Sequence, residues 1–167
     1  MYTTHGTLRR KQARPVGDAA LPPAKNTERQ HIQRVRDELR SLGMSRYGLV
    51  HAEVGHLAGL LHPDEHLGGV VYGHYDQGFA ILAATDRRII FVDAKPLFVT
   101  KDELTYYVVS GLSFGRTGIR ATVTLHTRVA DYTIHTYNKR CAEGFVAYIE
   151  SRCLEHHWKE VDHSTPT

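Results

Sequence analysis

The sequence predicts a mostly β protein with helices: a seven-stranded antiparallel barrel, capped by a C-terminal α-helix and preceded by two N-terminal helices. Apolar residues recur at helical spacing over residues 27–61, form short segments divided by turns over 62–136, and return to helical spacing after residue 138. The 167 residues are 41% hydrophobic and 23% charged, which is typical of a globular protein and excludes a disordered chain or a coiled coil. No run approaches about 18 apolar residues, so no membrane span is expected.

Residues 1–26 predict a disordered basic tail, because they contain scattered prolines and glycines and no apolar periodicity. Residues 1–25 hold five basic side chains and one acidic one, a net charge of +4, whereas residues 26–167 hold 16 basic and 17 acidic side chains. This balance argues against a nucleic-acid partner, except through weak anion binding by the tail. The candidate anion-binding residues of the tail are Arg9, Arg10, Lys11 and Arg14.

Residues 27–61 predict a pair of helices. Thr27 can cap the first helix and Gly43 can end it, whereas the second is expected to begin near Arg46 and to end before Pro63. Each helix carries one apolar stripe, made of Ile32, Val35, Leu39 and Leu42 in the first and of Val50, Val54, Leu57 and Leu61 in the second. Because each stripe needs a partner, we expect the helices to dock on the barrel, where they could cover a cleft, or to pair with a second copy.

Residues 62–136 predict seven short strands with brief connections, a meander that curls into a barrel. The expected strands are residues 66–75, 77–84, 88–92, 97–109 with an interruption at 100–102, 111–116, 119–127 and 130–134. Residues 119–127 alternate most cleanly between apolar and polar side chains, which is typical of an antiparallel strand with one buried face.

A terminal helix is expected after Asn138, whose side chain can cap the first turn. Its apolar stripe includes Phe145 and Ile149, which we expect to plug one mouth of the barrel as the helix cap. Residues 156–167 are expected to fray.

The sequence contains two cysteines, Cys141 and Cys153, both on the expected terminal helix. Two cysteines are too few for a disulfide framework, and the N-terminus lacks the apolar core of a secretory signal, so we expect a cytoplasmic protein. Cys141 lies near a helix N-terminus, where a thiolate is favoured, and is expected to be the more reactive thiol, with Cys153 in the core.

Residues 82–93, with the sequence LAATDRRIIFVD, resemble the strand–turn–strand segment of bacterial pleckstrin-homology (PH)-like domains, in which a Thr-Asp/Asn-x-Arg turn joins the second and third strands. Glu103 and Tyr106 are similar to the acidic and aromatic residues that precede the fifth strand in this family. The resemblance covers residues 62–155. It implies a small antiparallel barrel capped by a helix, and it implies no enzyme activity.

One alternative is a metal-dependent hydrolase. His62, Glu65 and His66 match the H-x-x-E-H pattern of inverted zinc peptidases, in which two histidines hold zinc and the glutamate activates water. Pro63 interrupts the motif, which also runs from the end of a helix into a strand. We therefore expect no enzyme, no bound metal and no cofactor.

The expected function is that of a non-catalytic interaction module. Lipid-binding PH domains carry clustered Lys and Arg in the first hairpin, but residues 74–78 contain neither, so specific phosphoinositide binding is not expected. We expect a protein or peptide partner, or self-association, at a cleft between residues 111–116 and the terminal helix, where a strand could be added to the sheet edge. The candidate binding residues are Gly111, Ser113, Gly115, Arg116, Arg87 and Arg88.

Overall fold

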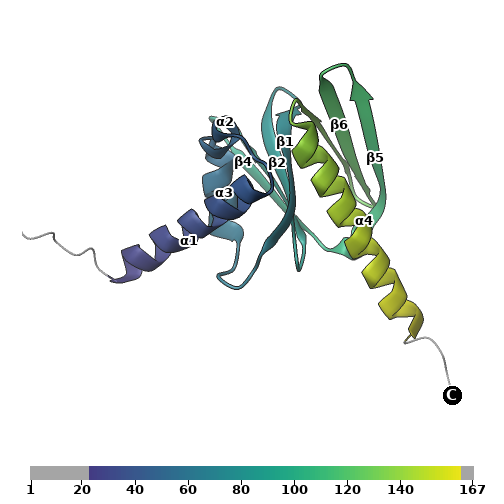
Figure 1. The fold of residues 1–167 in the computed structure, drawn as a ribbon, viewed down its shortest axis with the longest axis horizontal. Coiled ribbons are helices and arrows are strands. Elements are labelled where there is room, and N and C mark those ends of the chain that lie inside the picture. Colours follow the sequence, from purple (N-terminus) through teal and green to yellow (C-terminus); the bar gives the residue numbers. More distant parts are fainter. Residues whose placement is uncertain (1–22, 163–167) are drawn as a thin grey trace, which may run out of the picture.

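The computed structural model describes residues 23–162, with side chains for residues 25–155. The elements in chain order are α1 (Pro23–Ser41), α2 (Arg46–Leu49), α3 (Ala52–Leu60), β1 (Leu67–Tyr75), β2 (Gly78–Thr85), β3 (Ile89–Ala94), β4 (Val99–Leu104), the 3-10 helix η1 (Tyr106–Val108), β5 (Val109–Thr117), β6 (Arg120–Thr127), β7 (Asp131–Thr136) and α4 (Lys139–Asp162). Helices lie on both sides of a curled sheet, with α1–α3 on one side and α4 on the other (Figure 1). Within residues 23–162, no helix is long and apolar enough to cross a membrane.

The seven strands form one antiparallel sheet in the order β4-β3-β2-β1-β7-β6-β5. β1 pairs with β2 along its length but with β7 only at His74 and His135. Gly73 permits this crossing, because a Cβ atom there would lie 2.2 Å from the carbonyl oxygen of His135. β4 and β5 are the two edges of the described sheet, so the seven expected strands are present but the expected barrel is not closed.

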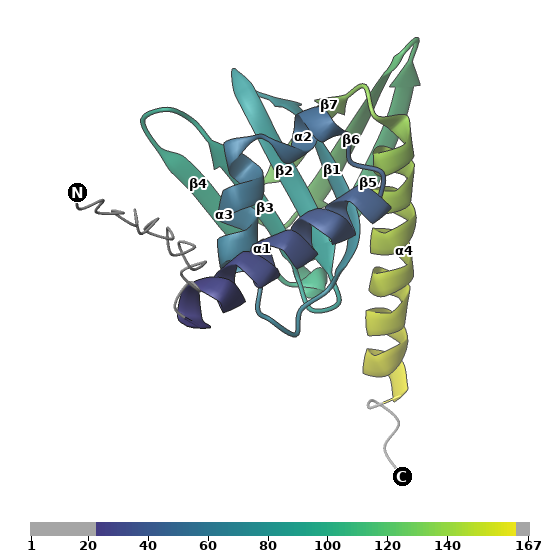
Figure 2. The ribbon, with the colours of Figure 1, turned by 60° about the vertical axis from the view of Figure 1, so that its left-hand side comes forward.

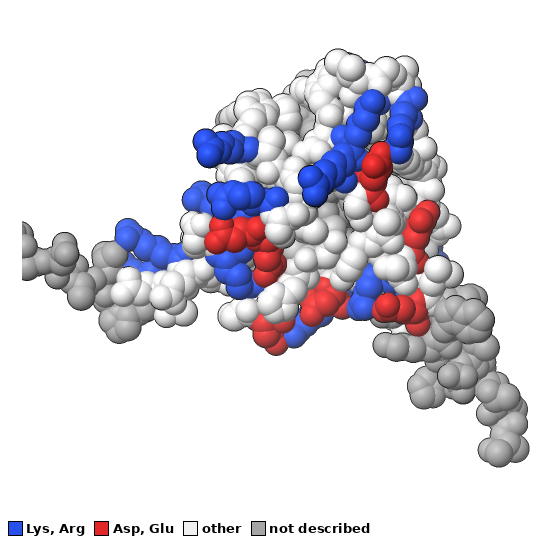
Figure 3. Space-filling view, in the orientation of Figure 1, with Lys and Arg blue, Asp and Glu red and all other residues white. Residues whose placement is uncertain are grey.

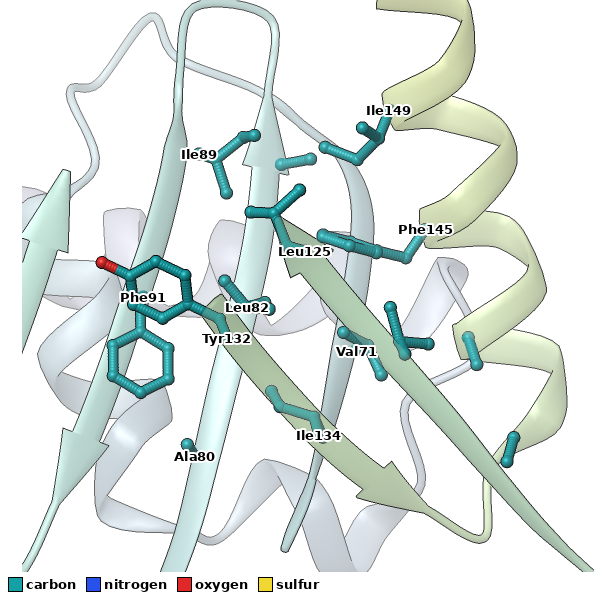
Figure 4. Close-up of a cluster of buried hydrophobic side chains, with 14 of the residues drawn as sticks. Val71, Ala80, Leu82, Ile89, Phe91, Leu125, Tyr132, Ile134, Phe145 and Ile149 are labelled. Atoms are coloured by element: carbon teal, nitrogen blue, oxygen red, sulfur yellow. The ribbon is translucent and has the colours of Figure 1, made fainter. Parts of the chain in front are cut away.

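The inner face of the curled sheet encloses one hydrophobic core, to which α4 contributes Phe145 and Ile149 (Figure 4). Both side chains are buried against strand residues such as Leu82 and Leu125. Asn138 caps α4 as its position suggests, because its Oδ1 accepts a hydrogen bond from the N–H of Cys141 at 3.1 Å. The expected C-terminal helix therefore covers the inside of the sheet.

The outer face of β1–β3 carries a second hydrophobic core, because α1 and α3 lie across it (Figure 2). Val35 and Leu39 of α1 and Leu57 of α3 are fully buried there. The helices thus dock on the sheet, but they do not cover the cleft beside β5. Since β2 and β3 are covered on both faces, every residue is buried from Ala80 to Thr85 in β2 and from Ile89 to Asp93 in β3.

Three helix boundaries differ from the expected ones. α1 begins at Pro23, four residues before Thr27, since proline is well tolerated in the first turn of a helix. The expected second helix is divided into α2 and α3 by His51, which has extended backbone angles, and Val50 of the expected stripe is 79% exposed. α4 continues to Asp162, past the expected fraying point. The tail residues Arg9, Arg10, Lys11 and Arg14 lie outside the described residues.

Candidate functional site

A groove with a volume of about 860 Å³ lies between the first half of β5 and the second half of α4. Its lining combines apolar side chains with the polar side chains of Tyr107, Arg128 and Glu150. The other side chains that contribute are Tyr106, Val109, Ser110, Leu112, Ile149, Cys153 and Leu154, with Gly111 between them. Leu154 is 61% exposed, so apolar surface is open to solvent here. The volume and the mixed lining are typical of a ligand-binding groove.

β5 forms the edge of the sheet beside this groove and, among the described strands, pairs with β6 alone. The two strands are joined by a two-residue turn after Thr117, with Gly118 at φ 58°, so Thr117 belongs to a hydrogen-bonded pair. Because such pairs alternate along an antiparallel ladder, every second residue of β5 directs its backbone groups away from β6. These outward-directed residues are Leu112, Phe114 and Arg116.

Three of the expected site residues of β5 lie on one face of the strand, because Gly111, Ser113 and Gly115 are two residues apart in a regular register with β6. Gly111 lines the groove. Ser113 and Gly115 do not line it, and the Ser113 hydroxyl lies 2.9 Å from Nε2 of His126 on β6. The structure therefore does not bring the three residues together in one site.

Two of the expected arginines form exposed ion pairs. Arg116 pairs with Glu143 of α4, and this pair joins the second half of β5 to the helix. Arg87 lies in the turn between β2 and β3, where its guanidinium is 2.6 Å from the carboxylate of Asp64. The open groove consequently lies beside residues 109–112 rather than along the whole of residues 111–116.

Arg88 is held by a network that ties β2, β3 and β4 to α3. Its guanidinium donates to the carboxylate of Glu65 from Nε at 3.0 Å and from a terminal nitrogen at 2.8 Å, and to the carbonyl of Leu60 at 2.9 Å. It also pairs with Glu103 of β4. Arg88 therefore has a structural role and does not line the groove.

Glu65 is fully buried and accepts hydrogen bonds from the Thr85 hydroxyl at 2.8 Å and from the N–H of His62 at 3.2 Å, besides those of Arg88. Burial raises the pKa of Glu65, but the hydrogen bonds, led by those of Arg88, outweigh it and lower the pKa below its ordinary value. The carboxylate is therefore ionised and saturated with donors, as in a structural ion pair.

The hydrolase alternative finds no support in this geometry. Nδ1 of His66 lies 3.0 Å from the carboxylate of Glu38 on α1, while Glu65 is directed at Arg88. In the part of the chain that the structure describes, no three His, Cys, Asp or Glu side chains are grouped so as to hold a metal ion. The motif residues instead join the helical pair to the start of β1.

The structure reverses the expected reactivity of the cysteines. Cys141 is buried beneath the end of α1, where its thiol donates to the carbonyl of Leu42 at 3.4 Å, and burial raises its pKa to about 11. Cys153 is only half-buried and lines the groove at the edge of the core, although burial raises its pKa as well. Cys141 is thus the protected thiol of the two.

The turn between β1 and β2 lacks the basic cluster of a lipid-binding PH domain. The nearby Lys95 is neutralised by two carboxylates, since its Nζ lies 3.2 Å from both Asp76 and Asp93. On the face shown in Figure 3, basic and acidic side chains of the described residues lie next to each other. Neither feature resembles a phosphate-binding cradle.

Of the groove residues, Gly111 alone was among the candidate binding residues named from the sequence. Glu150 and Leu154 follow the apolar stripe of α4 on its neighbouring helix face, a position that a helical wheel could have indicated. Tyr107 and Arg128 lie in connections that only the fold brings together, through a hydrogen bond of 3.0 Å from the N–H of Arg128 to the carbonyl of Val108.

No curated protein matches the chain. Among solved structures it is similar to the crystal structure of a DUF1696 family protein with a pleckstrin-homology domain from Shewanella loihica, with 16% identity, a TM-score of 0.34 and coverage of 60% of this chain and 89% of that one. The family model described as "Bacterial PH domain" matches residues 61–151, more than half of the chain. The chain therefore belongs to the bacterial PH domain family.

Proposed function

We propose that the chain is a non-catalytic interaction module that binds an extended segment of a partner protein as an added strand on β5. The observation that carries this proposal is the open edge of β5 beside the groove. Of the outward-directed residues, Leu112 lies beside the groove, and Phe114 and Arg116 continue the edge beyond it. The main chain of β5 would supply affinity, and the groove would select the side chains of the bound segment.

The groove favours a segment with apolar side chains at alternate positions. Successive side chains of a strand point to opposite faces, so every second side chain of the added segment would face α4. There it would meet apolar residues such as Val109, Ile149 and Leu154. Arg128 and Glu150 are both exposed at the groove and could pair with charges at the ends of the segment.

A random nine-residue peptide display library tests the proposal against the full chain. Selected peptides are expected to alternate apolar and polar residues, and Leu112→Pro is expected to weaken their binding about tenfold, because proline removes an outward-directed N–H. Methylation of alternate backbone nitrogens of a selected peptide gives two variants. The variant whose methylated nitrogens face β5 should lose binding, and the variant whose methylated nitrogens face away should retain it. Equal binding of the two methylated variants, or selected peptides whose affinity is unchanged by Leu112→Pro, would contradict strand addition.

The same edge could pair with β5 of a second copy, so self-association is a separate outcome of the experiment. Sedimentation of the tag-free chain measures it directly. A discrete dimer that Leu112→Pro disrupts, together with a library that yields no binders, would show that the partner of β5 is a second copy of the chain and not a peptide. A monomer with selected binders supports the proposal as stated.

A further inference from the structure

A second concave site lies apart from the open groove, where α2, β1, β7 and the start of α4 meet. It has a volume of about 390 Å³. Ser45 and Tyr47 from the helical segment form part of its lining, so the site combines the family domain with the helices that precede it. Its volume is within the range of small-molecule sites, which is about 300–1,000 Å³.

Aromatic rings form one wall of this pocket. The rings of Tyr47 and Phe79 are 6.1 Å apart in an edge-to-face arrangement, and the His74 ring lies 4.6 Å from that of Phe79. Tyr47 is 62% exposed, although it is a large ring with apolar faces. Tyr137, which is also exposed, contributes a further ring. Such rings offer faces and edges on which a planar ligand can stack.

Hydrogen bonds fix the position of Tyr72 in the pocket lining. Its hydroxyl lies 2.8 Å from the Ser45 hydroxyl and 3.5 Å from the side-chain nitrogen of Asn138. The N–H of Ser45 also donates to it at 3.3 Å. Since α2, β1 and the α4 cap meet at this hydroxyl, the pocket is organised before any ligand binds.

The polar groups at the pocket favour an anion. Among the residues with described side chains, no carboxylate lines it, whereas Lys139, His74 and His135 do. The Lys139 ammonium donates to the carbonyl of Gly118 at 2.8 Å, which leaves two of its N–H groups for a ligand. Nδ1 of His135 lies 2.9 Å from the Thr122 hydroxyl, and the His74 ring packs on the Phe79 ring.

We propose that this pocket binds a small planar aromatic carboxylate. The ring of the ligand would stack on the exposed ring of Tyr47, because the Phe79 ring beside it is already stacked on His51 at 4.6 Å between centroids. The carboxylate of the ligand would lie within reach of Lys139.

Of the described residues that line the pocket, Lys139 alone carries a permanent positive charge, which matches the single charge of a carboxylate. The nearby Arg120 is engaged with the ring and the hydroxyl of Tyr137. A phosphate usually requires several charged donors at once. This proposal is independent of the strand-addition function at β5.

Titration of the ¹⁵N-labelled full chain with 2-naphthoate, followed by NMR, tests the proposal. The backbone amide signals of Gly73, His74 and Lys139 are expected to shift saturably with a dissociation constant of about 1 mM. The neutral 2-naphthamide, which has the same shape, is expected to bind about fivefold more weakly because it lacks the charge.

Three variants separate the contributions of ring and charge. Lys139→Met should weaken 2-naphthoate about fivefold and leave 2-naphthamide unchanged, whereas Tyr47→Ala should weaken both ligands about fivefold. Lys101→Met on β4, outside the pocket, is the matched control and should change neither. The absence of saturable shifts, equal binding of acid and amide, or shifts confined to the groove residues Val109 and Leu112 would overturn the proposal.

Discussion

The two halves of the sheet differ in the number of faces that they bury. In β2, every residue from Ala80 to Thr85 is buried, because α1 and α3 cover the outer face and α4 with the other half of the sheet covers the inner face. In β6, buried and half-buried residues alternate, because only the inner face is covered. The same antiparallel ladder is therefore a central layer at one end and a solvent-facing layer at the other.

The two edge strands of the sheet also differ, in their length and in the charge of their side chains. β4 is six residues long and carries the consecutive charged residues Lys101, Asp102 and Glu103, two of which also bind Tyr132 and Arg88. β5 is nine residues long and has no charged side chain before Arg116. Charged, short edges discourage strand pairing, whereas a long uncharged edge permits it. The difference suggests that pairing is suppressed at β4 and retained at β5.

The largest expected effect concerns the ion-pair network of Arg88 with Glu65 and Glu103, which secures the β4 half, the part of the sheet that ends at β4. Arg88→Met would leave the carboxylate of Glu65 buried without its charged partner, which costs about 3–5 kcal/mol of the free energy of unfolding. Urea denaturation measures this loss. The double variant Arg88→Met/Glu65→Leu should recover most of it, because both buried charges are then removed together.

Arg87→Met is the matched control, since Arg87 is the neighbouring arginine and pairs with Asp64 at the surface. Its urea midpoint should equal that of the original chain, because an exposed pair is screened by solvent. A midpoint for Arg88→Met that equals this control would show that the network does not secure the β4 half, and the contrast between the halves would then rest on the helices alone.

Much of this architecture follows from local patterns in the sequence. The alternation over 119–127 predicts β6 well, because in a strand with one buried face every second residue is apolar and buried. The apolar stripes that contain Val35 and Leu57 indicate that each helix packs on another part of the molecule, but they do not identify that part. The unbroken apolar run from Ile89 to Val92 was the available signal that β3 is covered on both faces.

The candidate site was harder to predict than the fold. The edge position of β5 follows from the order of strands, but the face on which Ser113 lies depends on the register with β6, and a shift of one residue would exchange it with Leu112. The partners Glu65 and Arg88 are 23 positions apart, so their ion pair exists only after the helices and the sheet have met. Long-range contacts of this kind leave no periodic signal.

A change at the junction of the two halves is expected to have an intermediate effect. Gly73→Ala would place a Cβ atom 2.2 Å from the backbone oxygen of His135, so β7 must move away from β1. We expect a loss of about 1–3 kcal/mol in the free energy of unfolding, measured by urea denaturation. Gly115→Ala in β5 is the control: a Cβ there meets nothing within 4 Å, so its stability should be unchanged or slightly higher.

The smallest expected effect is a dependence on acid that belongs to the helix-covered half. Burial raises the pKa of Glu38, but the N–H of Leu67, His66 and Arg34 lower it further, so its pKa lies below the ordinary value of 4.5. A carboxyl group with a lowered pKa stabilises the fold fully above that value, and the contribution is lost as the pH falls through the lower pKa of the folded state.

Glu38→Gln should therefore flatten the decline of the urea midpoint below about pH 4.5, at a cost of about 1 kcal/mol at neutral pH. The glutamine oxygen can still accept the hydrogen bond from Leu67, which isolates the effect of the charge. Urea midpoints between about pH 3 and 7 measure both quantities. Since Glu65 has a lowered pKa for the same kind of reason, part of the decline should persist in the variant. An unchanged slope would assign the acid sensitivity to carboxylates elsewhere and would remove one distinction between the two halves.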